Sequence, residues 1–337
     1  MRKRSIIQMT LVGVAVGAAL AAVALFIPWL PESASEQADI IDSVYWLVTV
    51  ICVVIFALVA GVSVYAVYKF RARPDDLDDG SPIHGHTGLE IVWTLVPTAL
   101  VTAIAVYSGV ALAQAENLPD DGHRVVRVTA EQFAWSFTYP DVELENGQAL
   151  TTGELVLPVD EAVEFFITSK DVLHSFWVPE WRMKQDAVQG VTTRTVVEPT
   201  KLGTFEVICT ELCGLGHAIM RSQARVLSAQ DFEAWVAEQR RLAAEGGAVQ
   251  GESLFTAQCG SCHVLADAGT QGQVGPNLDD ALADADEAFV RESIVEPNAS
   301  IAEGFQPDVM PQNYGELFTE EQVNGLVEYL LEATGGG

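Results

Sequence analysis

Three long apolar runs in the first third of the chain constrain its fold more than any other feature. They cover residues 6–30, 44–68 and 89–113 of the 337-residue sequence, and the last run contains one charged side chain, Glu90. A helix rises about 1.5 Å per residue, so runs of this length cross the ~30 Å hydrocarbon core of a bilayer. The sequence therefore predicts a multidomain membrane protein whose later residues fold outside the lipid.

Basic side chains predict how these runs are oriented. One cluster precedes the first run, and Lys69, Arg71 and Arg73 follow the second. Cytoplasmic loops are enriched in Lys and Arg. We therefore expect residues 69–88 in the cytoplasm, and everything after residue 114 on the periplasmic or extracellular side of a bacterial plasma membrane.

The first run has two interpretations. Residues 1–35 resemble a signal peptide, with a basic start, an apolar stretch and the small residues Ser33 and Ser35. They are also long enough to remain as a first transmembrane helix. In both cases residues 36–113 form a transmembrane helical hairpin.

The charge balance separates the later domains and excludes one class of partner. The chain has 18 Lys and Arg against 46 Asp and Glu, a formal net charge of −28. Because phosphate contacts need cations, we expect no nucleic-acid binding. Residues 246–337 hold one basic and 16 acidic side chains, a net charge of −15. We expect this acidic stretch to be a domain of its own.

Residues 114–245 are predicted to form a β-sandwich. The stretches 124–139, 161–168, 193–198 and 204–208 are rich in Val, Thr and aromatic residues, with turn residues between them. A helix is expected over 231–245. The pair Gly246 and Gly247 then forms a short linker to a helical domain over 246–337.

A sulfur-rich cluster marks the first candidate site. Cys209, Cys213, His217 and Met220 fall within twelve residues, and His174 lies upstream. Soft sulfur ligands with imidazole favour copper. Two alternatives are a disulfide between the cysteines, in an oxidising compartment, and a tetrahedral zinc site. Zinc leaves Met220 unexplained, because a thioether is not among its usual ligands.

The pattern Cys-x-Glu-x-Cys-Gly-x-x-His-x-x-Met, after Asp-Val-x-His-Ser-Phe, resembles the dinuclear copper A motif of cytochrome c oxidase subunit II. The resemblance implies a cupredoxin-like sandwich in which both cysteines bridge two copper ions. It implies further ligands in the side chains of His174, His217 and Met220 and the backbone carbonyl of Glu211. It also implies that the Glu211 carboxylate binds a magnesium ion at the interface with subunit I.

The same resemblance points to three further residues. Members of that family usually carry a tryptophan at the position of Phe133, where electrons enter from soluble cytochrome c, so Phe133 and Trp135 become electron-path candidates. Glu90 occupies a Glu-x-x-Trp-Thr motif that, in related oxidases, lies at the mouth of a proton-uptake path. As an alternative, Glu90 is a favourable charge at a helix N-terminus.

A second candidate site follows in the acidic domain. Cys259, Cys262 and His263 form the Cys-x-x-Cys-His signature of covalent haem c attachment, with the histidine as an iron ligand. The sixth ligand should be Met or His. Met310 is the one candidate after His263. Residues 246–337 resemble an all-α class I cytochrome c.

These features together indicate the electron-input subunit of a haem–copper oxidase. We expect electrons to pass from a soluble or membrane-bound cytochrome c, or a similar donor, through haem c and copper A to subunit I, with subunit III as a further partner. No catalytic residue for oxygen reduction is expected here, because no apolar run contains a histidine. Alternatives are the input subunit of a copper A nitric oxide reductase and a tethered electron carrier without a fixed partner.

Overall fold

The computed structural model describes residues 3–71, 82, 84–119, 122–144, 147–245, 248–260, 262–312, 314–318 and 320–335. The predicted linker, Gly246 and Gly247, lies outside the described residues, as does Arg73. The chain divides into two compact units. One comprises Met1–Glu32 and Asp39–Ala115, and the other Ser33–Ala38 and Glu116–Gly337.

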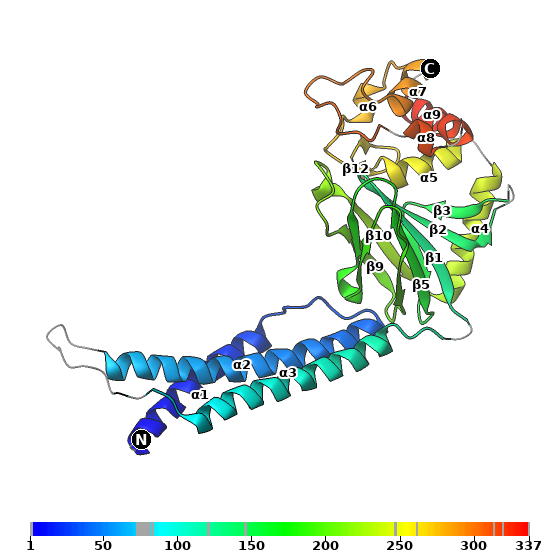
Figure 1. Cartoon of the computed structure of the whole chain (residues 1–337). Helices are drawn as coiled ribbons and strands as arrows, with labels where there is room; N and C mark the ends of the chain where they lie inside the picture. Colours follow the sequence, from blue (N-terminus) through cyan, green and yellow to red (C-terminus); the bar gives the residue numbers. More distant parts are fainter. Residues whose placement is uncertain are drawn as a thin grey trace. The chain divides into compact units, whose positions relative to one another are not determined.

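The first unit consists of three helices, α1 (Lys3–Phe26), α2 (Glu36–Phe70) and α3 (Thr87–Ala115) (Figure 1). Each is long and apolar enough to cross a membrane, as predicted. Small residues let α1 approach α2 closely: a Cβ built on Gly61 would lie 3.0 Å from Cα of Gly13. Between α2 and α3, the hydroxyls of Ser43 and Tyr107 lie 2.9 Å apart. Most large apolar side chains of these helices are exposed, as contact with lipid or partner subunits requires.

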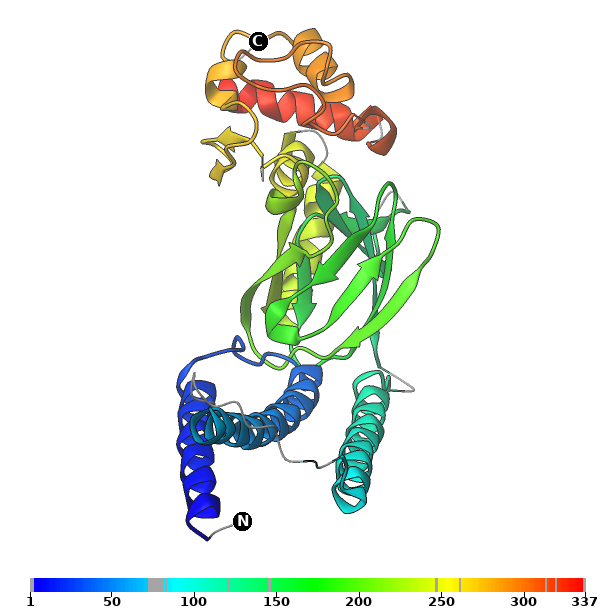
Figure 2. The ribbon, with the colours of Figure 1, turned by 60° about the vertical axis from the view of Figure 1, so that its left-hand side comes forward.

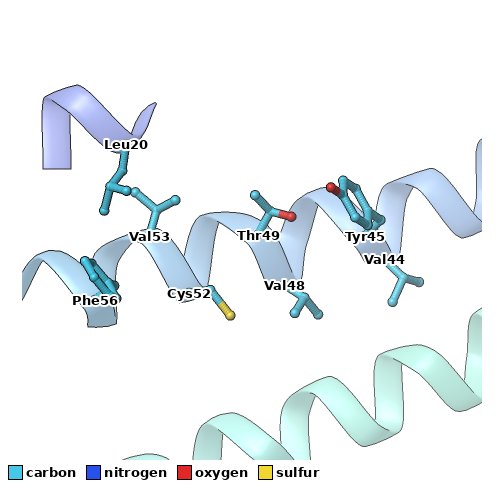
Figure 3. Close-up of a pocket in the computed structure, with 8 residues that line it drawn as sticks. All are labelled: Leu20, Val44, Tyr45, Val48, Thr49, Cys52, Val53 and Phe56. Atoms are coloured by element: carbon cyan, nitrogen blue, oxygen red, sulfur yellow. The ribbon is translucent and has the colours of Figure 1, made fainter. Parts of the chain in front are cut away.

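A shallow apolar groove runs along α2, as Figure 3 shows. Its lining comprises Leu20 of α1 and seven α2 side chains: Val44, Tyr45, Val48, Thr49, Cys52, Val53 and Phe56. Cys52 is a free thiol within this apolar surface. It therefore serves as a small apolar residue.

Residues 116–245, here called the sandwich domain, form two five-stranded sheets. The first has the order β3 (Ala149–Thr152), β2 (Ala134–Glu143), β1 (Arg124–Glu131), β5 (Val163–Ser169) and β8 (Thr193–Val197). The second has the order β4 (Leu155–Pro158), β10 (Arg221–Leu227), β9 (Gly203–Cys209), β6 (His174–Trp177) and β7 (Lys184–Ala187). The pairs β1–β5 and β4–β10 are parallel and the others antiparallel.

The sandwich core follows the alternation of its strands. On β2, Trp135, Phe137 and Tyr139 are fully buried between the sheets, while the residues between them face outward. The single strand expected over 124–139 is a hairpin instead: Gln132 and Phe133 form its turn, and Glu131 pairs with Ala134. The turn lets alternate residues of both strands lie in the core.

Two further segments complete the sandwich domain. Helix α4 (Ala229–Glu245) runs along the sheets, and its side chains join their core (Figures 1 and 2). The segment Ser33–Ala38 also belongs to this unit. Ser35 is buried, its hydroxyl donates to the carbonyl of Trp181, and it accepts a hydrogen bond from the Ala38 N–H, as an N-cap does at the start of α2.

Residues 248–335, here called the C-terminal domain, are mainly helical. The helices are α5 (Ala248–Gln258), α6 (Leu278–Ala281), α7 (Glu287–Val295), α8 (Tyr314–Leu317) and α9 (Glu320–Thr334), with a short hairpin of β11 (Val264–Leu265) and β12 (Thr270–Gln271). Helices α5 and α9 cross in close contact (Figure 2). The contact is so close at Gly251 that a Cβ built there would overlap the carbonyl of Gly325. The predicted fold class, with apolar helices, a β-sandwich and a helical C-terminal domain, is confirmed.

Candidate metal and haem centres

Three segments of the second sheet bring the sulfur-rich cluster together. Cys209 ends β9, and β10 begins at Arg221, directly after Met220, so residues 210–220 form the loop that joins this antiparallel pair. His174 begins β6, which pairs with β9 through Phe176 and Cys209. Ligands distant in sequence therefore meet at one end of the sheet.

The cluster has the geometry of a soft metal site. The sulfur atoms of Cys209 and Cys213 lie 3.9 Å apart, nearly twice the length of a disulfide bond. Met220 Sδ lies 3.7 Å from Cys213 Sγ and 3.1 Å from His174 Nδ1. The ligand atoms of His174, Cys209 and Cys213 all lie within 4.8 Å of one another. His217 reaches the cluster through Cys213, with Nδ1 3.6 Å from its sulfur.

Hydrogen bonds fix which ring nitrogen of His174 faces the cluster. Nε2 lies 2.8 Å from Oδ1 of Asp171, so Nδ1 points at the sulfur atoms. Asp171 also accepts hydrogen bonds from the N–H groups of Gln132 and Val172. Burial opposes its ionisation, but these bonds hold the pKa of Asp171 below its usual value. Such carboxylate–histidine pairs orient metal ligands in many proteins.

The two thiols differ in how readily they ionise. Burial alone raises the pKa of Cys209, but hydrogen bonding to His174 and to neighbouring backbone groups outweighs it and lowers that pKa. Burial, together with the adjacent Cys209 sulfur, raises the pKa of Cys213. A metal ion bound between the sulfur atoms would favour the second thiolate beside the first.

Phe133 and Gln132 pack directly on the loop 210–220, which carries Cys213. The Gln132 side-chain amide donates to the carbonyl of Cys213. A Cβ built on Gly216 would lie 2.4 Å from the Phe133 ring, and one on Gly214 would lie 3.2 Å from it. Only glycine permits this approach at Gly216. Trp135, the next aromatic residue, is buried with its ring centroid 6.3 Å from that of His174.

Glu211 lies on the exposed side of the loop. Its backbone carbonyl lies 3.3 Å from Cys209 Sγ, within the cluster, while its side chain is exposed. The neighbouring Leu212 and Leu215 are 76% and 85% exposed, and Val172 and Leu173 beside His174 are also exposed. Exposed apolar side chains gathered around a site indicate a contact surface for another protein.

The C-terminal domain contains a cavity of about 370 Å³ that brings the predicted haem ligands together. Cys259, Cys262, His263 and Met310 all line it, with apolar side chains such as Leu326 and Leu330. His263 Nδ1 lies 3.0 Å from the carbonyl of Pro276, which directs Nε2 away from that carbonyl. Burial lowers the pKa of His263 and favours the neutral imidazole that binds iron. These residues fit a covalently bound haem.

Glu90 caps the N-terminus of α3. Its carboxylate accepts a hydrogen bond from the backbone N–H of His86 at 3.0 Å, and the Leu89 N–H lies 3.2 Å from His86 Nδ1. This reciprocal arrangement resembles a capping box. The structure thus gives Glu90 a role at the helix terminus, and its role in proton uptake stays a prediction.

Family models match three successive stretches of the chain. Residues 22–110 match the transmembrane domain of cytochrome C oxidase subunit II, residues 124–226 its periplasmic domain, and residues 248–334 cytochrome c. The cytochrome c oxidase subunit 2 of Thermostichus vulcanus is 33% identical in an alignment of 266 residues, and the match covers 64% of this chain and 79% of that protein. The chain belongs to the cytochrome c oxidase subunit II family.

A second relative agrees with this assignment. The cytochrome c oxidase subunit 2 of Alkalihalophilus pseudofirmus is 32% identical over 303 residues, 83% of this chain and 84% of that protein. A crystal structure of the periplasmic domain of subunit II of cytochrome oxidase from Bradyrhizobium japonicum covers 37% of this chain and 99% of its own, at 28% identity and a TM-score of 0.33. The three family models and the two subunit 2 relatives show that the chain is a membrane-bound oxidoreductase subunit with a copper A domain and a haem c domain.

Two residues that support the sulfur-rich cluster are not predicted from the sequence. Asp171 was noticed only as part of a motif, although a carboxylate three residues before a ligand histidine is a signal for an orienting partner. Gln132 carried no signal, because its bond to the Cys213 carbonyl depends on the turn between β1 and β2.

Proposed function

We propose that this subunit II passes electrons from an external donor to haem c, then to dinuclear copper A, and then to subunit I, where oxygen is reduced to water. One observation carries the proposal: a single chain holds both the sulfur–imidazole cluster around Cys209 and Cys213 and the cavity around Cys259, Cys262 and His263. In this role the side chains of Cys209, Cys213, His174, His217 and Met220, with the Glu211 carbonyl, would hold the copper ions.

When bound, copper and haem supply one-electron redox chemistry, and the protein side chains set their positions. Asp171 orients His174, and His263 is held by the Pro276 carbonyl. Met310 lines the haem cavity and is proposed as the sixth iron ligand. Both sites exclude most solvent, because Cys209, Cys213, His174 and His263 are buried.

The partner contacts follow from the exposed surface around copper A. We propose that subunit I binds the apolar residues beside Glu211, and that the Glu211 carboxylate binds magnesium at this interface. The exposed side chains of Leu212 and Leu215 support such a contact. Subunit III, and a cytochrome c or similar carrier as donor, complete the proposed assembly. Glu90 is proposed to lie at the mouth of a proton-uptake path in the neighbouring subunit.

The membrane orientation is proposed from charge and from packing. Lys69 in the last turn of α2 and Arg71 beyond it favour a cytoplasmic loop before α3. The sandwich domain after α3 and the segment Ser33–Ala38 at the start of α2 belong to one compact unit, so we expect them to share one side of the membrane. We assign that side to the periplasm or exterior of a bacterial plasma membrane, with domains 1–35, 36–113, 114–245 and 246–337.

Deletion of residues 246–337 tests the electron order. The truncated subunit should still load copper A, but oxygen consumption with a soluble cytochrome donor should fall severely, because the haem that accepts electrons is gone. Phe133→Trp should partly restore it, by supplying the tryptophan that the family resemblance places at this position as the entry point for electrons. Near-normal turnover in the truncated, copper-loaded complex would contradict the proposal.

A further inference from the structure

One side chain connects the C-terminal domain to the sandwich domain beside the first haem-attachment cysteine. Gln258 is the last residue of α5 and precedes Cys259. It is only 8% exposed, and its Nε2 donates to the hydroxyl of Ser136 at 3.4 Å. Its backbone carbonyl accepts from the hydroxyl of Tyr314, which lines the haem cavity, also at 3.4 Å. Gln258 therefore contacts both domains.

Ser136 lies on the strand that leads to the copper cluster. Successive residues of β2 face opposite sides of the sheet, so Ser136 faces outward while Trp135 is buried in the core and 1% exposed. The Trp135 ring centroid is 6.3 Å from that of His174, with the rings inclined at 64°. A short series of contacts thus joins Cys259 to His174 through Gln258, Ser136 and Trp135.

The interface around this contact is loosely packed. A cleft of about 670 Å³ lies there, with walls from both domains. Polar side chains contribute much of its lining, among them Thr129, Thr138 and Lys170 on the sheet and Ser253, Glu321 and Gln322 on the C-terminal domain. Interfaces of this kind leave domains free to move unless direct contacts hold them. A partly buried hydrogen bond at the edge of such a cleft therefore influences domain position.

We propose that Gln258 is a positioning residue for electron transfer: its hydrogen bond to Ser136 docks the haem-attachment end of α5 on the outer face of β2, next to Trp135. The inference rests on the proposed order from haem c to copper A. It adds a specific docking contact between the two domains, and this contact sets how often the haem-bearing end lies within transfer distance.

The test uses isosteric variants in the intact oxidase complex. Ser136→Val removes the hydroxyl and Ser136→Thr keeps it, with nearly the same side-chain shape. Gln258→Leu removes the other partner, and Gln239→Leu changes a second glutamine of the same cleft as the matched control. Photoreduction of haem c, followed by the appearance of reduced copper A, gives the transfer rate. The enhancement of copper A spin relaxation by ferric haem c gives an independent measure of their separation.

A hydrogen bond of ordinary net strength changes a docking equilibrium roughly two- to ten-fold. Ser136→Val and Gln258→Leu should therefore slow the transfer by that factor and weaken the relaxation enhancement. The double variant should be no slower than either single one, because both remove the same contact. Ser136→Thr and Gln239→Leu should match the parent, and the optical spectrum and reduction potential of the haem should be unchanged in all variants.

Two outcomes overturn the inference for different reasons. Parent-like transfer and relaxation in both Ser136→Val and Gln258→Leu would show that the contact does not position the domains. A parent complex in which photoreduced haem c never reduces copper A would instead refute the electron order on which the inference rests.

Discussion

The carboxylate of Asp171 should control how tightly the copper site holds its metal. Its Oδ1 lies 2.8 Å from His174 Nε2 and accepts hydrogen bonds from the Ser169 hydroxyl and the Val172 N–H. Its Oδ2 accepts a hydrogen bond from the Gln132 N–H at 2.7 Å. Asp171→Ala removes all four bonds. Asp171→Asn can keep its oxygen at the Oδ1 position and so keep the hydrogen bonds made there, although its amide group then faces the Gln132 N–H. Because the alanine variant keeps none of these bonds, it should be the more severely affected.

Loss of an orienting partner typically costs 10- to 100-fold in metal affinity. We expect about 10-fold for Asp171→Asn, which keeps a neutral acceptor for His174, and about 100-fold for Asp171→Ala. Competition with a copper chelator on the purified full-length subunit measures this affinity. Asp141→Asn, which changes an exposed carboxylate paired with Arg124, is the control. Affinities within two-fold of the parent in both Asp171 variants would refute the reasoning.

Three further predictions follow from packing and ligation. Gly216→Ala places a Cβ 2.4 Å from the Phe133 ring, so it should lower the free energy of unfolding by about 1–3 kcal/mol and cause loss of copper. Thermal unfolding and metal analysis measure these two effects. An unchanged melting temperature would contradict the prediction. Met310→Ala should abolish the methionine-to-iron charge-transfer band and lower the haem potential, so a surviving band would exclude Met310 as ligand. Mass spectrometry of the mature subunit should find Ala34 and Ser35 retained, because both are wholly buried against the sandwich domain; a chain that begins after Ser35 would contradict this.

The local features of this chain were predictable because they depend on short patterns. Length and hydropathy alone predicted α1, α2 and α3, and the twelve-residue span of Cys209, Cys213, His217 and Met220 predicted that these side chains form one site. The haem motif likewise lies at the end of one helix, α5, where its cysteines and histidine follow one another in sequence.

Features that depend on distant contacts were not predictable. The turn at Gln132 and Phe133 divides an apparently continuous strand, because the β1–β2 register is set by packing between sheets. In the sequence, Ser35 is a small residue near a predicted cleavage site. It is buried only because Trp181 and Pro199, which are distant in sequence, contact it in the folded chain. The bond from Gln258 to Ser136 spans 122 positions of the sequence and carries no local pattern.

Metal analysis of the purified full-length subunit tests the central claim most directly, because one chain should hold both redox centres. We expect two copper ions and one haem iron per chain. Cys209→Ser or Cys213→Ser should remove the copper and leave the haem spectrum intact, since the cysteines contribute to the shared sulfur pair and the haem is attached elsewhere. A parent subunit that contains one zinc ion and no copper, with or without haem, would contradict the account.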